Sequence, residues 1–169
     1  MTRAGSLGRA WVLPADVDTD QLAPGATMKH GLDVTAQHCL EVLRPEFART
    51  VRRGDVVVAG ANFGIGSSRE QAASVLVHLG VAAVVAPAFA GLYFRNAFNV
   101  GLLLLTCPDA ERIGDGELIA VDARAGRVLR ADGSTLACEP IPGFLLDMVE
   151  AGGLLPQLKR RLTPLTESP

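Results

Sequence analysis

The segment NFGIGSSREQ, residues 62–71, contains the side chains with the clearest capacity for chemistry. Ser67, Ser68 and Arg69 place two hydroxyls and a guanidinium between an apolar run and an expected helix. Together with the free backbone N–H groups of a turn, these groups can bind a carboxylate or a phosphate. A simple strand-to-helix turn requires glycine, but it requires neither an arginine nor paired hydroxyls. The three residues are therefore candidates for an anion-binding or catalytic site.

A purely structural interpretation of this segment is also open. Ser67 could cap the following helix, with Glu70 completing a capping box. Gly64 and Gly66 could serve only the tight turn. Arg69 is then unexplained, because a cation in the first turn of a helix opposes the helix dipole unless an anion is bound there.

Three common loop motifs do not match the segment. The phosphate-binding loop GxxxxGK[ST] requires a lysine that is missing here. The dinucleotide fingerprint GxGxxG has Arg69 in place of its third glycine, and after Glu70 the next acidic residue is Asp109, too far along the chain to hold a ribose. The hydrolase elbow GxSxG is absent.

The elements expected to position this segment form an α/β pattern. The loop PADVDTDQLAPG follows an expected first strand over residues 9–13, and such acidic, turn-rich loops are either sites or solvated turns. The runs DVVVAG, VAAVVA and LLLLTC are typical of buried strands. Expected helices over residues 72–79 and 89–101 separate them, which predicts parallel pairing with right-handed crossovers.

The remaining segments complete a single expected domain, residues 1–169, with a core over about 9–162 and a tail over 163–169. Two short helices are expected within residues 33–51, and three antiparallel strands after Pro108. The last helical segment is interrupted at Gly152 and Gly153.

Composition excludes several classes of protein. The chain has 49% apolar and 20% charged residues and a net charge of −2, which argues for a globular protein without a broad nucleic-acid surface. No apolar run approaches the ~20 residues of a membrane helix, and the N-terminus lacks a signal-peptide pattern, so a cytoplasmic protein is expected. The three cysteines have no metal-binding spacing, so we expect reduced, buried thiols and no metal on this chain.

The segments DVDTDQLAPG, GANFGIGSSREQAA and AFAGLYFRNAFNVGLLLL together resemble the small subunits of 3-isopropylmalate dehydratase. These subunits are the detached swivel domain of the aconitase superfamily, and the likeness runs from about residue 9 to about residue 162. The resemblance implies a three-layer β/β/α swivelling-domain fold of the α/β class with a mixed, partly parallel sheet. The common form of the turn reads FGCGSSREHA, so Ile65 replaces a cysteine and Gln71 a histidine.

The resemblance also implies a function. Family members are hydro-lyases that interconvert 2-isopropylmalate and 3-isopropylmalate in leucine biosynthesis, and they act only with an aconitase-like large subunit. The large subunit holds a [4Fe-4S] cluster, and no cofactor is expected on this chain. Small subunits of homoaconitase or of related hydroxy-acid dehydratases are alternatives, and a non-catalytic anion-binding module is a further one. The isolated chain could form a homo-oligomer.

The resemblance assigns roles to individual residues. Ser67 would be the base that removes the proton next to a carboxylate, and Ser68 and Arg69 would bind that carboxylate. Asp20, the last aspartate of the DTD loop, matches an active-site acid, whereas Asp18 is expected to be structural. In the segment ATMKH, Met28 and Lys29 would contact the variable group of the substrate. Met28 suits a branched alkyl group and Lys29 an extra carboxylate, so isopropylmalate is the expected substrate and a homoaconitate-like tricarboxylate the alternative.

Overall fold

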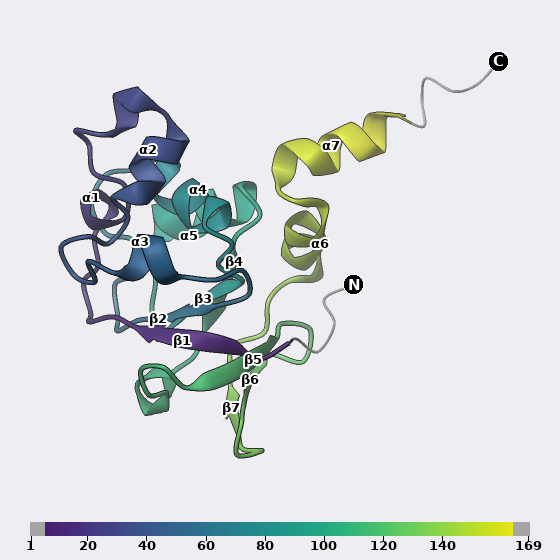
Figure 1. Cartoon of the computed structure of the whole chain (residues 1–169). Helices are drawn as coiled ribbons and strands as arrows, with labels where there is room; N and C mark the ends of the chain where they lie inside the picture. Colours follow the sequence, from purple (N-terminus) through teal and green to yellow (C-terminus); the bar gives the residue numbers. More distant parts are fainter. Residues whose placement is uncertain (1–5, 164–169) are drawn as a thin grey trace.

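Strand β1 (Gly8–Val12) is where the two halves of a seven-stranded sheet meet in the computed structural model, which describes residues 6–163. It pairs parallel with β2 on one side and antiparallel with β5 on the other, and the strand order is β4-β3-β2-β1-β5-β6-β7 (Figure 1). The mixed, partly parallel sheet expected from the sequence is thereby confirmed. The other strands are β2 (Val56–Val58), β3 (Ala83–Ala86), β4 (Leu103–Thr106), β5 (Leu118–Asp122), β6 (Arg127–Arg130) and β7 (Thr135–Ala137).

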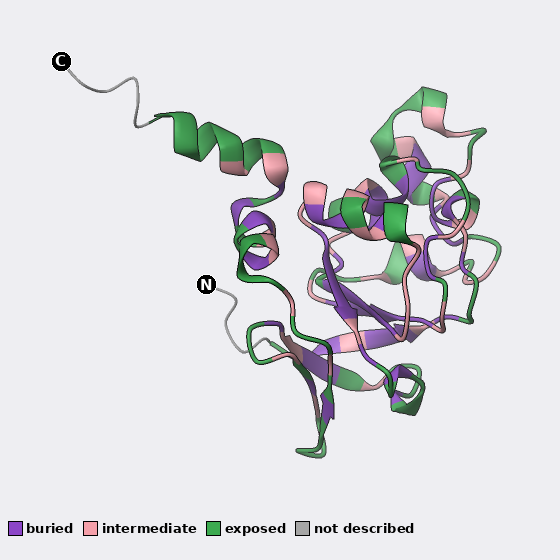
Figure 2. Cartoon of the chain, turned by 180° about the vertical axis from the view of Figure 1, so that it is seen from behind, coloured by how far each residue is buried: buried purple, intermediate pink, exposed green. Residues whose placement is uncertain are grey.

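Most of the helices gather over the parallel half of the sheet, while β6 and β7 form a hairpin that extends away from them (Figure 1). Strands β2 and β3 are buried at every position, as Figure 2 shows, which explains their unbroken apolar sequences. The α-helices are α1 (Thr19–Leu22), α2 (Leu32–Gln37), α3 (Phe47–Thr50), α4 (Gln71–His78), α5 (Gly91–Asn99), α6 (Gly143–Ala151) and α7 (Leu154–Leu162), and the 3₁₀ helices are η1 (Met28–His30) and η2 (Ala110–Arg112).

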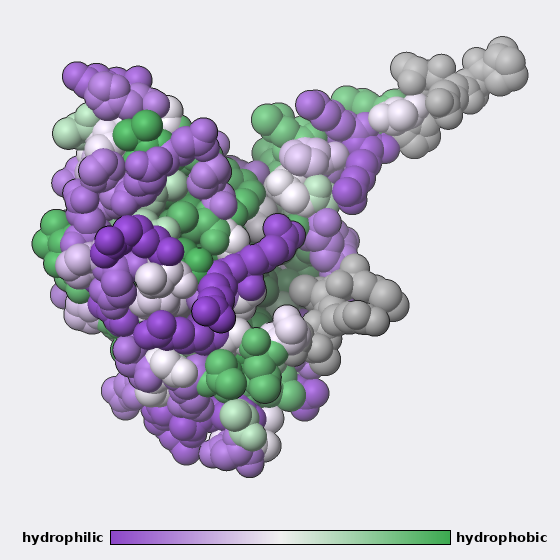
Figure 3. All heavy atoms as spheres, viewed as in Figure 1, coloured by the Kyte–Doolittle hydropathy of each residue, from purple (hydrophilic) through white to green (hydrophobic). Residues whose placement is uncertain are grey.

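The two C-terminal helices are separated as the sequence predicts. Gly152 and Gly153 have φ angles of 89° and 116°, which only glycine adopts readily, and they join α6 to α7. Helix α7 projects from the body of the protein in both cartoon views. Hydrophilic side chains cover most of the body on the face shown in Figure 3. The predicted tail from residue 164 onward lies outside the described residues.

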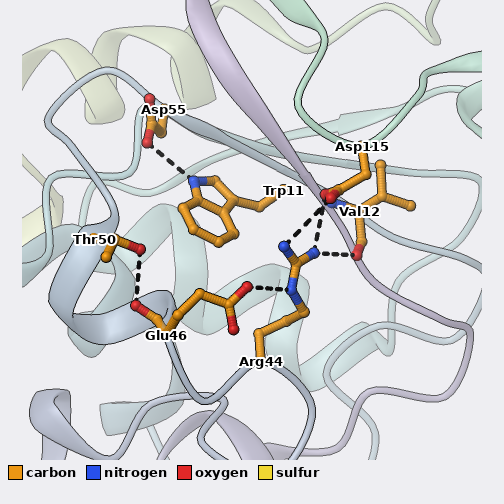
Figure 4. Close-up of polar contacts among 7 residues, drawn as sticks. All are labelled: Trp11, Val12, Arg44, Glu46, Thr50, Asp55 and Asp115. Carbon is orange, nitrogen blue, oxygen red and sulfur yellow. Dashed lines mark hydrogen bonds and ion pairs between the residues drawn. The ribbon is translucent and has the colours of Figure 1, made fainter.

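Arg44 and Trp11 hold the segment around α3 against the sheet: Arg44 bonds to β1 (Figure 4), and the ring of Trp11 packs edge-to-face on Phe47. The indole Nε1 of Trp11 donates to Asp55 Oδ2 at 3.0 Å. Arg44 Nη1 donates to Asp115 Oδ1 at 2.9 Å and to the carbonyl of Val12 at 3.2 Å. No buried side-chain nitrogen or oxygen in residues 6–163 lacks a hydrogen-bond partner, so these polar groups impose no unpaired burial cost.

Cys39 and Cys107 are buried, as the sequence predicts, whereas Cys138 is half-buried; all three are free thiols. Burial raises the pKa of Cys39 well above its usual range and that of Cys138 to about 12, which keeps both thiols protonated. Across residues 6–163, no group of three or more His, Cys, Asp or Glu side chains could hold a metal ion. None of the helices in this range has the length and apolar character to cross a membrane.

Candidate active site

The glycine–serine–arginine turn (residues 64–69) and the DTD loop (residues 14–25) meet at one edge of the sheet. The DTD loop follows β1, and the turn comes after β2; because these strands are parallel, both segments lie beyond the carboxyl ends of their strands. In α/β sheets, this edge is where ligands bind. A β-bridge joins Asp18 to Ile65, and the N–H of Thr19 donates to the carbonyl of Ile65 at 2.8 Å. The two loops are therefore one structural unit.

A second contact joins the two loops closer to the ends of β1 and β2, between Asp16 and Asn62. Asp16 and Asn62 both have left-handed backbone conformations, with φ angles of 60° and 61°. The Asn62 carboxamide donates to Asp16 Oδ1 at 2.9 Å. Asp and Asn tolerate this conformation better than other non-glycine residues, so their presence at both positions fits the sharp change in chain direction.

Gly64 and Gly66 are required by close approach as well as by backbone conformation. Gly64 has a φ of 86°, and a Cβ there would lie 2.1 Å from Cγ of Tyr93. Gly66 has a φ of 106°, and its Cβ would lie 3.0 Å from Thr19 Oγ1. Tyr93 is fully buried and donates to the carbonyl of Ala72 at 3.2 Å, so the ring cannot move aside. The glycines let the turn pack directly against α5 and the DTD loop.

Arg69 connects the predicted site residues. Its Nε donates to Ser67 Oγ at 2.6 Å, and its Nη1 donates to Asp20 Oδ1 at 3.1 Å and to the carbonyl of Ala23 at 2.8 Å. The hydroxyls of Thr19 and Ser67 lie 3.3 Å apart. The structure thus brings Ser67, Arg69 and Asp20 together, as the sequence predicts. Their catalytic roles stay predictions.

Asp20 is held as an anion. The backbone N–H of Gly25 donates to its Oδ1 at 3.0 Å, and this bond, followed by the contact with Arg69, lowers the pKa of Asp20 below 3.8. The Asp20 side chain is 70% exposed and that of Arg69 21%, so the carboxylate faces solvent while the guanidinium is largely covered. Asp18 instead caps α1 in a capping box with Gln21, which confirms its structural role.

The prediction that Ser67 could cap a helix is wrong. Helix α4 begins at Gln71, Glu70 occupies the N-cap position, and no side chain caps it. The hydroxyl of Ser67 instead contacts Arg69 and Thr19. The positive charge nearest to Ser67 is therefore the guanidinium of Arg69, because the N-terminus of α4 begins further along the chain. The alternative that left Arg69 unexplained is excluded.

Two positioning residues were not identified from the sequence. Thr19 is 2% exposed and lies against Ser67 and Gly66. Asn96, on α5, donates to the carbonyl of Ser68 at 2.9 Å and holds the turn from the opposite side. Thr19 stands inside the DTD segment, which is the one signal that could have indicated it. Ser68 is exposed, and its hydroxyl has no partner within residues 6–163.

Met28 and Lys29, both on η1, have different surroundings. Met28 lines a cavity of about 310 Å³ together with Leu32, Ser74, Glu70 and other residues of α2 and α4. Glu70, which follows Arg69 directly in the sequence, also lines this cavity. The cavity, and Met28 with it, therefore adjoins the candidate site. Lys29 does not line this cavity and is exposed.

Comparison with known proteins identifies the family. The aconitase C-terminal domain family matches residues 24–110. The chain is 46% identical over 156 residues to the 3-isopropylmalate dehydratase small subunit 1 of Methanopyrus kandleri, covering 90% of this chain and 92% of that protein. The chain belongs to the family of 3-isopropylmalate dehydratase small subunits.

Other members of this family agree with the assignment. A small subunit from Archaeoglobus fulgidus is 42% identical, covering 88% of this chain and 94% of that protein. A methanogen homoaconitase small subunit from Methanothermobacter thermautotrophicus is 43% identical over 88% of this chain and 87% of its own length. The crystal structure of 3-isopropylmalate dehydratase leuD from Methanocaldococcus jannaschii has a TM-score of 0.89 at 36% identity, covering 95% of this chain and 97% of that chain. The aconitase-type fold class expected from the sequence is confirmed.

Proposed function

We propose that this small subunit, with a large subunit, forms a hydro-lyase that interconverts 2-isopropylmalate and 3-isopropylmalate in leucine biosynthesis, as a cytoplasmic enzyme. The observation that carries the proposal is the contact of Ser67 Oγ with Arg69 Nε at 2.6 Å beside Asp20, in a chain whose full-length relatives are small subunits of this enzyme. A hydroxyl alone is a weak base and requires a neighbouring group that stabilises its alkoxide. The guanidinium of Arg69 is positioned to do so.

In the proposed reaction, Ser67 Oγ takes the proton from the carbon next to a substrate carboxylate. The hydroxyl leaves from the neighbouring carbon, and together the proton and hydroxide make one water. Adding this water back to the double bond with the two positions exchanged gives the isomer. As the proton leaves, negative charge develops on the carboxylate, so donors placed there favour the transition state.

Ser68 and Arg69 supply such donors. Nε and Nη1 of Arg69 are engaged within the protein, whereas Nη2 has no partner within residues 6–163. Nη2 and the hydroxyl of Ser68 can therefore donate to the substrate carboxylate. Asp20 keeps the guanidinium in the orientation that serves both Ser67 and the substrate.

The [4Fe-4S] cluster belongs to the large subunit in this proposal. The residues of this chain do not fit a cluster, because two of its three cysteines are buried and residues 6–163 contain no group that could hold a metal. When bound in the partner, the cluster supplies an iron that holds the substrate hydroxyl. This chain contributes the base and the carboxylate contacts.

We expect the purified chain to be colourless and inactive by itself. Mixing it under anaerobic conditions with an aconitase-like large subunit should produce dehydratase activity, measured by the ultraviolet absorbance of the unsaturated intermediate. Iron–sulfur absorbance in the purified chain, or turnover without the large subunit, would contradict the proposed division of labour. A binding module without catalysis would leave the mixture inactive although the two chains associate.

Homoaconitate is the second candidate substrate, because a relative of similar identity is a homoaconitase small subunit. The environment of η1 favours isopropylmalate, since Met28 lines the cavity beside the turn and Lys29 does not. We expect Met28→Ala to lower kcat/KM for isopropylmalate about tenfold through KM, as truncating an apolar contact costs ~1–3 kcal/mol. Lys29→Val, the neighbouring control, should change this value less than about twofold.

The same two variants distinguish the substrates. If homoaconitate is the substrate, Lys29→Val should lower kcat/KM for the tricarboxylate by a factor of about ten or more, through the loss of a charge contact. Measuring kcat/KM for both acids in the reconstituted enzyme decides between them. Unchanged kinetics in both variants would show that η1 does not contact the substrate.

A further inference from the structure

A second cavity lies at the edge of the sheet opposite to the candidate active site. Its volume is about 490 Å³, and its lining includes Gly8 and Arg9 at the start of β1, and Arg52, Arg53 and Asp55 just before β2. The glycine–serine–arginine turn, in contrast, lies beyond the carboxyl ends of these strands. The cavity and the candidate active site are therefore at opposite ends of the parallel strands.

Three arginines give this cavity an excess of positive charge. Arg52 and Arg53 are exposed, and neither has a carboxylate partner within residues 6–163. The guanidinium of Arg9 lies over the ring of Trp11, 4.0 Å from its centroid, which fixes its orientation. The chain as a whole has a net charge of −2, so this local positive charge is opposite in sign to the net charge of the protein.

The one acidic group in the lining, Asp55, forms no ion pair with these guanidiniums. Asp55 is 6% exposed, and its carboxylate accepts the backbone N–H groups of Arg9 and Arg52 at 3.1 and 2.9 Å. It also accepts the indole N–H of Trp11 at 3.0 Å (Figure 4). Its oxygens are therefore occupied by N–H groups of β1 and of the segment before β2, which form the floor of the cavity. Glu46 and Asp115 are both paired with Arg44, and the charge of Arg9 acts on both carboxylates as well. Arg52 and Arg53 therefore carry the positive charge of the cavity that has no carboxylate partner within residues 6–163.

The floor is closely packed. A Cβ on Gly8 would lie 2.0 Å from the carbonyl oxygen of Gly54, so the start of β1 rests directly on the backbone that precedes β2. The bonds from Asp55 tie the same two segments together. A rigid floor presents the arginines without a large ordering cost on binding.

We propose that this cavity is a binding site for a phosphate group, either inorganic phosphate or the phosphate of a monoester. Guanidinium groups match the oxygens of a phosphate dianion with paired N–H donors, which makes arginine the preferred residue for this recognition. The volume exceeds the needs of a single phosphate and lies in the range of small-molecule sites. The cavity therefore has room for the organic part of a phosphorylated metabolite. This inference does not depend on the proposed enzymatic function.

Isothermal titration of the full chain with inorganic phosphate and with glucose 6-phosphate, in 0.1 M chloride (roughly physiological screening), tests the proposal. We expect saturable binding of at least one probe, and the two probes distinguish the free ion from the ester. The double variant Arg52→Ala/Arg53→Ala should weaken this binding at least tenfold. Arg161→Ala, which removes an exposed arginine from α7, is the matched control and should bind as the unchanged chain does.

The glycine–serine–arginine turn could also bind phosphate, so the titration is repeated with Arg69→Gln. Binding that survives Arg69→Gln and is lost in the Arg52/Arg53 variant supports the proposal. It is overturned if no probe binds above chloride, or if the Arg52/Arg53 variant, with unchanged circular dichroism and Tm, binds as tightly as the control. It is also overturned if that variant weakens only association with the large subunit, because the cavity would then hold an acidic segment of the partner.

Discussion

Ser67→Ala is expected to abolish turnover of the reconstituted enzyme while leaving the chain folded. The variant removes the proposed base, and we expect kcat to fall at least ~10³-fold, equivalent to about 4 kcal/mol of transition-state stabilisation. Stability should change little, because Ser67 is exposed and caps no helix. Its lost contacts with Arg69 and Thr19 correspond to about 1 kcal/mol. The measurements are kcat and KM in the complex, and the free energy of unfolding of the isolated chain.

Ser134→Ala is the matched control for this variant. The hydroxyl of Ser134 donates to Asp132 Oδ1 at 2.6 Å in the turn between β6 and β7, far along the sheet from the glycine–serine–arginine turn. The same atom is removed and a comparable hydrogen bond is lost, but activity should be retained. A near-unchanged kcat for Ser67→Ala would exclude Ser67 as the base and leave it a residue that positions Arg69.

The strands and helices of the parallel half could be predicted because each is short and strongly patterned. Val56–Val58 and Ala83–Ala86 are buried on both faces, so their apolar runs stand out from the sequence around them. The central place of β1 could not be predicted. Its antiparallel partner β5 pairs Gly8 with Ile119, and no local property of either segment indicates a contact across that separation.

The candidate site could likewise be predicted from the sequence only in part. The turn residues Ser67, Ser68 and Arg69 could be identified because their side chains are unusual for a tight turn. The start of α4 was predicted to within one residue, but the alternative in which Ser67 caps it was wrong. A serine followed by a glutamate three residues later satisfies the capping pattern whether or not the backbone is helical there. The contact of Asn96 with the carbonyl of Ser68 depends on the packing of α5 against the turn, which is a tertiary feature without a local signal.

Arg69→Lys is expected to be nearly as damaging as Ser67→Ala, although it keeps the positive charge. Arg69 uses separate nitrogens to reach Ser67, through Nε, and Asp20 and Ala23, through Nη1. A single ammonium cannot satisfy these groups and a substrate carboxylate together. We expect kcat/KM to fall ~100-fold or more, with changes in both kcat and KM, because the same guanidinium serves the base and the substrate.

Arg130→Lys provides the control for losing an arginine–carboxylate pair as such. Arg130 holds Glu117 through two bonds of 2.6 and 3.1 Å on the antiparallel half of the sheet, so its replacement should affect stability but not kcat/KM. Equal activity losses in both variants would attribute the effect of Arg69→Lys to folding.

Asp20→Asn separates positioning from direct chemistry. The pKa of Asp20 is lowered below 3.8, chiefly by the N–H of Gly25 and then by Arg69, so its carboxylate stays charged throughout the neutral range and its hold on Arg69 does not titrate there. If Asp20 acts only by orienting Arg69, Asp20→Asn should lower kcat/KM on its own but add little to Arg69→Lys in the double variant. Additive losses would instead require Asp20 to contact the substrate independently. The double-mutant cycle, measured as kcat/KM in the reconstituted complex, therefore decides whether this aspartate is a positioning residue or a catalytic one.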